Sequence, residues 1–180
     1  MDIPLFSYRS LLTMLHGLGA GGGGLLTLFA ALFALWTMRT EGHVDSVVER
    51  RARNIWWLLV LAAVLLWGAV LGGTYLVFPP YRATPPEGLT DLTAYPRSLI
   101  QSNPETTWLH SFAMEIKEHV PWIAAMLATA VASVAVRYKS LLLSDRAINR
   151  MATVGVTICL ALAASAAVLG VFVNKVAPLE

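Results

Sequence analysis

The sequence predicts an all-α integral membrane protein, a single domain over residues 1–180 built as a four-helix bundle. It also predicts a proline-rich external segment and a helical extension before the third span. Hydrophobic residues make up 57% of the chain and charged residues only 13%, whereas a soluble domain carries about 25% charged residues. The chain also contains four long apolar stretches, with basic residues concentrated between alternate stretches. These observations predict the fold class.

The four apolar stretches set the expected spans, because a hydrocarbon core of about 30 Å needs roughly 20 apolar residues in a helix. Residues 10–38, 55–78 and 151–173 contain no Lys, Arg, Asp or Glu. Residues 120–136 form a shorter stretch at the lower end of the required range. The first stretch is much longer than the roughly 7–15 apolar residues of a signal-peptide core. We therefore expect a retained first span and four spans in total.

The distribution of Lys and Arg predicts the orientation, because these residues are enriched in cytoplasmic loops. The connections between spans 1 and 2 and between spans 3 and 4 carry Arg39, Arg50, Arg51, Arg53, Arg137, Lys139, Arg146 and Arg150. We expect both connections in the cytoplasm and both termini outside. The small size and the arginine-rich loops lead us to expect a bacterial inner (cytoplasmic) membrane.

Residues 79–119 form the predicted external segment between spans 2 and 3. It opens with two prolines, which oppose a continuous helix. Further along, Asn103 suits a helix N-cap, Pro104 the first helical position and Glu105 the positive helix end. We expect a helix to begin there and to run into span 3.

Polar residues of three spans fall at a common depth near the outer surface. At 1.5 Å per residue, His16, Tyr75 and His119 lie roughly 34, 33 and 27 Å from the basic residues at the cytoplasmic ends. Glu115 precedes His119 by one helical turn and shares its face. His110 precedes it by nine residues and points to the opposite side. Histidine within a span is a functional hypothesis by default.

His16 and His119 therefore match the arrangement of two axial haem ligands, with imidazoles on separate helices and room between them. Six glycines lie between Gly17 and Gly24, so Gly17 and Gly21 would let a porphyrin approach the backbone. Glu115 would orient an imidazole, and Tyr75 would lie at the same height. The same glycines also suit close helix packing, with the small residues of span 2 as partner.

Two other interpretations of these residues stay open. A single copper, zinc or iron ion would use the two histidines and Glu115, with Glu118 as a further ligand. Alternatively, no cofactor is bound, and these polar groups form a hydrated interface or hydrogen bonds between helices.

Leu15 and His16, followed by small residues, resemble the first span of four-helix b-type cytochromes and of copper-resistance D-like membrane domains. The resemblance covers about a quarter of the chain. It implies that His16 and His119 correspond to histidines that bind haem or metal in those families. Two further histidines of the usual diheme pattern are missing from the spans, so it implies one haem at most.

The function expected is a membrane electron-transfer subunit of a respiratory or photosynthetic complex, binding one haem b near the external face. It would pass electrons between membrane quinone and an external carrier or partner subunit, and is a redox subunit rather than a stand-alone enzyme. A cofactor-free structural subunit of a membrane complex is the alternative. The net charge of +2 does not suggest nucleic acid, no GxSxG hydrolase motif is present, and the midplane lacks the polar residues of a transporter.

Overall fold

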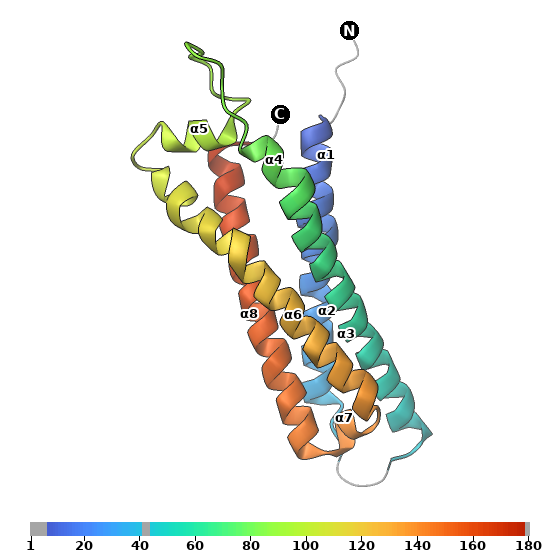
Figure 1. Ribbon diagram of the computed structural model, residues 1–180. Helices are drawn as coiled ribbons and strands as arrows, with labels where there is room; N and C mark the ends of the chain where they lie inside the picture. The colour runs from blue at the N-terminus through green and yellow to red at the C-terminus, as the bar shows by residue number, and fades with distance from the viewer. Residues whose placement is uncertain (1–6, 41–43, 179–180) are drawn as a thin grey trace.

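The described residues of the computed structural model, 7–40 and 44–178, form helices, turns and irregular connections, with no strand among them. Four long continuous helices pack along one another (Figure 1). Each is long and apolar enough to cross a membrane; they are Tyr8–Thr37, Ser46–Tyr81, Leu109–Tyr138 and Arg146–Val176. For the described residues, the predictions of an all-helical chain and of four helices able to span a membrane are confirmed, and these helices indicate an integral membrane protein.

The two ends of the bundle differ in the segments that they carry. The start of the first helix and the end of the fourth lie near the short helices α4 and α5, while α7 lies at the opposite end (Figure 1). We call these the α5 end and the α7 end. The short, arginine-rich connections between spans 1 and 2 and between spans 3 and 4 both start and end at the α7 end, because successive spans run in opposite directions (Figure 1). Residues 1–6, 41–43 and 179–180 are outside the described part, and the side of the membrane that each end faces stays a prediction.

Each of the first two long helices contains a π-helical segment. Span 1 consists of α1 (Tyr8–Met14), η1 (Leu15–Gly22) and α2 (Gly23–Thr37). Span 2 consists of α3 (Ser46–Gly72), η2 (Gly73–Val77) and α4 (Phe78–Tyr81). The π-helices η1 and η2 form i→i+5 hydrogen bonds, so each turn holds more residues than an α-helical turn.

Span 3 also contains a π-helix, whereas span 4 is a single α-helix. Span 3 consists of η3 (Leu109–Met114) and α6 (Glu115–Tyr138), and span 4 is α8 (Arg146–Val176). The short helices α5 (Pro96–Gln101) and α7 (Leu141–Ser144) lie in the connections.

The helices of spans 2 and 4 begin well before their apolar stretches because aspartates cap them. The Asp45 carboxylate accepts hydrogen bonds from the N–H groups of Val47 and Val48 at 3.0 and 2.8 Å. Asp145 caps α8 in the same way, at 2.8 and 3.0 Å. Such caps satisfy N–H groups that have no partner within the helix. Hydropathy therefore locates the membrane core, and the aspartates locate the helix starts.

The segment between spans 2 and 3 differs in part from the expectation. The helix of span 2 continues through the two prolines to Tyr81, because they occupy the first positions after η2, where a missing N–H group breaks no α-helical bond. At the other end, the Asn103 carboxamide accepts a hydrogen bond from the Glu105 N–H group at 2.9 Å. Continuous helix then begins at Thr107, so span 3 starts far before residue 120.

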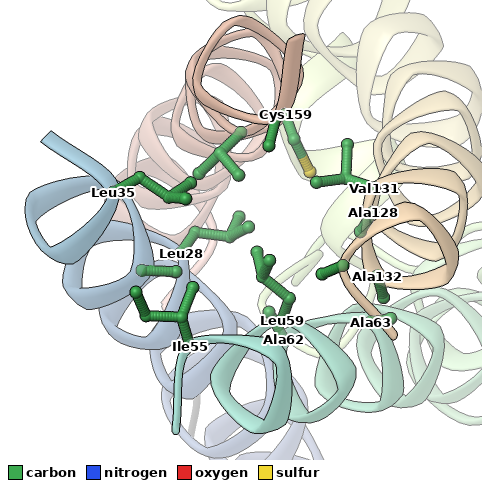
Figure 2. Close-up of a cluster of buried hydrophobic side chains, with 14 of the residues drawn as sticks. Leu28, Leu35, Ile55, Leu59, Ala62, Ala63, Ala128, Val131, Ala132 and Cys159 are labelled. Atoms are coloured by element: carbon green, nitrogen blue, oxygen red, sulfur yellow. The ribbon is translucent and has the colours of Figure 1, made fainter. Parts of the chain in front are cut away.

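Small residues on α6 allow the helices to approach closely. Five alanines of α6 are buried: Ala124, Ala125, Ala128, Ala132 and Ala135. The helix packs most extensively against α3 and α8. Figure 2 shows Leu28, Leu59, Val131 and Cys159 of the four spans pointing toward a common centre. The Cys159 thiol donates to the Ala124 carbonyl at 3.2 Å, so the cysteine packs α8 against α6.

Candidate functional site

Three of the four spans change to π-helical geometry toward the α5 end of the molecule. We call the region of η1, η2 and η3 the π layer. Here η1 packs against α3 and α8, and η3 packs against α8. π-helical segments inside α-helices are rare, and they occur frequently at functional sites. The π layer is therefore the candidate functional region.

His16 lies in η1, and its ring lies against η2. A methyl group added to Gly73 would lie 2.7 Å from the ring atom Cε1 and 3.2 Å from Nδ1, so the ring fits because residue 73 is glycine. Nδ1 is buried and has no hydrogen-bond partner among the described residues. The Ala69 backbone carbonyl interacts with the ring but forms no hydrogen bond with Nδ1. An unsatisfied buried polar group costs about 1–3 kcal/mol, which a bound ligand would recover.

Lys117 lies in the first turn of α6 and reaches span 4. A methyl group added to Gly170 would lie 2.7 Å from the ammonium nitrogen Nζ. The half-buried Lys117 side chain forms no ion pair or hydrogen bond with any described residue. Its charge acts on the His16 ring. A cation without an anionic partner inside a span is costly, and this cost points to a role in binding.

Two contacts, His16 with Gly73 and Lys117 with Gly170, are linked by the electrostatic effect of Lys117 on the His16 ring; we call these four residues the His16–Lys117 site. His16 of span 1 lies against Gly73 of span 2, and Lys117 of span 3 lies against Gly170 of span 4. All four spans therefore contribute a residue to the site. The ammonium group offers three hydrogen-bond donors, and a neutral imidazole offers one donor and one acceptor. The site is therefore suited to a ligand head that carries oxygen acceptors.

A second polar cluster lies closer to the α5 end. The Tyr81 hydroxyl and Nδ1 of His110 are hydrogen-bonded at 2.9 Å. Arg97 of α5 and Glu118 of α6 both act electrostatically on these two side chains. The Arg97 Nε atom is buried without a partner among the described residues. This cluster connects α5 to spans 2 and 3.

The structure does not bring His119 together with His16. The His119 side chain is 72% exposed, and its Nδ1 atom is hydrogen-bonded to the Glu115 carbonyl of its own helix at 2.8 Å. Glu115 is also exposed, with its carboxylate 3.8 Å from the His119 ring. Their side chains therefore lie on the outer surface of span 3, whereas Lys117 occupies the side that faces the bundle.

The other predicted site residues also lie away from His16. Tyr75 is 67% exposed. No atom lies within 4 Å of a methyl group added to Gly17, and at Gly21 the nearest atom is the backbone oxygen of His16, at 3.4 Å. These two glycines therefore receive no other helix. Of the predicted site residues, His16 alone enters the His16–Lys117 site.

The predicted metal site is not assembled in the described part of the chain. No group of three or more His, Cys, Asp or Glu side chains there could hold a metal ion. Glu115 and His119 are exposed on span 3, and the half-buried Glu118 acts electrostatically on Tyr81 and His110, so the described structure does not gather these groups around His16.

The sequence carries a signal for Lys117 that a search for histidines overlooks. Lys117 precedes Ala124 by seven residues and follows Ala113 by four, and both alanines are fully buried. Residues at these spacings share one face of a helix. Lys117 therefore belongs to the apolar stripe that faces the bundle, and His119 does not. Nothing comparable in the sequence marks Gly73 or Gly170 as the glycines that receive the polar side chains.

Comparisons of the chain with protein-family models, with curated proteins and with solved structures find no match. The resemblance of span 1 to four-helix b-type cytochromes and copper-resistance D-like domains therefore stays a prediction. A function has to be argued from the site itself.

Proposed function

We propose that this chain is a membrane subunit of an electron-transfer complex and binds a quinone head in the π layer. The observation that carries the proposal is the Lys117 ammonium group, which lies between spans without an anionic partner, near a histidine with an unpartnered Nδ1 atom. Quinone carbonyl oxygens are acceptors that match the Lys117 donors. Other membrane subunits and an external electron carrier are the partners that we propose.

His16 lies toward the outer end of its span, eight residues inside the start of its helix and about 34 Å from the basic residue at the other end. A quinone head is neutral, so it can enter the bundle here together with its apolar tail.

A haem held between His16 and His119 does not fit the placement of these residues. Two axial ligands must face one iron from opposite sides, and the His119 side chain points out of the bundle. The ring of His16 lies against Gly73, with no porphyrin-sized gap between them. The haem b stays a prediction from the sequence and is not part of the proposed function.

A cofactor-free structural subunit is the second candidate, favoured by the exposed glycines of η1. Gly17 and Gly19 have no atom within 4 Å of an added methyl group, so another subunit's helix could approach the backbone closely there. This function makes no use of the unpartnered charge of Lys117, and for that reason we rank it second.

The proposed location is the bacterial cytoplasmic membrane, with the α5 end outside. The supporting observation is that eight Lys and Arg residues flank or lie in the two short connections, which both lie at the α7 end (Figure 1). The positive-inside rule then puts that end in the cytoplasm. The His16–Lys117 site would lie in the outer half of the bilayer.

Quenching of tryptophan fluorescence by a short-chain quinone tests the proposed function. We expect saturable quenching of the purified protein in lipid nanodiscs, because Trp108 and Trp122 lie on span 3 on either side of Lys117. Replacing these two tryptophans with phenylalanine should remove a large part of the quenching, and Trp67, whose ring packs edge-on against Trp122, accounts for the rest. Replacing Trp56 and Trp57, near the α7 end of span 2, should leave it.

His16→Ala should weaken this quinone binding about tenfold or more, because a hydrogen bond in a buried site contributes about 1.5 kcal/mol. Quenching that is linear in quinone concentration, or that is equal for the two tryptophan pairs, would contradict a specific site in the π layer.

A further inference from the structure

An open apolar groove runs between α3 and α6 toward the α7 end. Its volume is about 670 Å³. Val60, Val64 and Trp67 line it from α3, and Thr129 and Ser133 from α6. These positions are three or four residues apart, so each set forms one stripe along its helix. Trp67 precedes Gly73 by six residues, about 9 Å along the helix, so the groove lies on the α7 side of the His16–Lys117 site.

Two cations lie at one end of this groove, where span 3 ends. Arg137 and Lys139 both line it, and both are exposed. Neither side chain forms an ion pair or hydrogen bond with any residue of the described ranges. From Thr129 to Arg137 the groove extends about 12 Å along α6, close to the roughly 15 Å of one hydrocarbon leaflet.

The backbone of Lys139 is strained at this place. Its φ is 48° and its ψ is −119°, a combination that residues with a Cβ atom rarely adopt. Among the described non-glycine residues it is the single one with a positive φ. Such strain costs on the order of 1–3 kcal/mol and often marks a functional position. This conformation ends α6 and places the Lys139 side chain at the α7 end of the groove.

We propose that this groove binds an anionic phospholipid from the leaflet at the α7 end. One acyl chain lies along the apolar stripes of α3 and α6, and the phosphate group contacts Arg137 and Lys139. Charge complementarity selects this occupant, because basic pockets between spans bind anionic lipid heads.

Native mass spectrometry of the full chain tests the proposal with phosphatidylglycerol and phosphatidylcholine of identical acyl chains. We expect phosphatidylglycerol to bind more tightly, by about fivefold for each charge contacted. The double variant Arg137→Gln with Lys139→Gln should lower its affinity to that of phosphatidylcholine. The matched control, Arg50→Gln with Arg51→Gln, removes two charges near the same end that do not line the groove, and should leave the preference intact.

A second pair of variants tests the acyl-chain site. Ser133→Trp fills the groove without changing a charge and should weaken binding of both lipids. Ser165→Trp places the same side chain on an exposed position of α8 and should have no effect. Equal affinity for the two lipids in the unmodified protein would overturn the proposal. It would also be overturned if the Arg50→Gln, Arg51→Gln variant lost the preference for phosphatidylglycerol as fully as the Arg137→Gln, Lys139→Gln variant. A dimer that excludes lipid from the groove would also overturn it.

Discussion

Lys117→Met is expected to stabilise the protein while it abolishes quinone binding. The ammonium group has no anionic partner among the described residues and lies within a membrane span, where a charge is costly. Methionine fills a similar volume without that cost, so the free energy of unfolding should rise by about 1–2 kcal/mol. Quinone affinity should fall about tenfold to a hundredfold, because hydrogen bonds from a charged donor contribute about 1.5–3 kcal/mol.

Lys175→Met is the matched control, because Lys175 is an exposed lysine in the last turn of α8 and also lies toward the α5 end. It should change neither property. Unfolding by SDS in mixed micelles measures the stability, and tryptophan quenching measures the affinity. A Lys117→Met protein that is less stable, or that binds quinone normally, would show that the lysine serves packing rather than binding.

Gly73→Val is expected to displace the His16 ring and to abolish the His16–Lys117 site. The first carbon of the new side chain would lie 2.7 Å from Cε1 of His16, and the branched side chain cannot avoid the ring by rotation. Overpacking of this kind costs about 1–3 kcal/mol. We expect a matching loss of stability, together with a loss of quinone binding at least as large as that caused by His16→Ala.

The neighbouring glycine provides the control for this prediction. A methyl group added to Gly72 meets no atom within 4 Å, so Gly72→Val should have little effect on stability or binding. Combining Gly73→Val with His16→Ala should restore stability without restoring binding, because the valine then occupies the space of the ring. Equal destabilisation by the two valine variants would show that His16 does not pack against Gly73.

The four spans could be predicted from the sequence, because the length of an apolar stretch corresponds to the thickness of the membrane. The orientation that the Lys and Arg residues indicate stays a prediction. The helix ends could not be predicted from hydropathy alone. Asp45 and Asp145 start their helices several residues before the apolar stretches, since capping acts on backbone N–H groups and not on lipid. The helix of span 2 continues beyond its predicted end because its prolines follow a π-helical segment.

The candidate site was only partly predictable. The position of a residue along a span follows directly from residue number, whereas the side of the helix that faces the bundle has to be inferred from the pattern of apolar residues. The sequence predicts His16 and His119 at the same depth in the membrane. The buried face of span 3 that contains Ala113 and Ala124 also contains Lys117, and His119 lies outside this face.

The glycine run likewise could not be assigned to contacts from the sequence alone. Gly23 and Gly24 pack against Leu65 and Leu66 of α3, whereas Gly17 contacts no other helix.

The ¹⁵N NMR spectrum of histidine-labelled protein in nanodiscs measures ligand contact with the His16–Lys117 site most directly. The His16 Nδ1 signal is assigned by its absence in His16→Gln. Addition of a short-chain quinone should shift this signal, because Nδ1 has no hydrogen-bond partner in the described structure, and should leave the His119 signals in place. Saturable quinone binding with an unchanged Nδ1 signal would contradict a quinone head in the π layer.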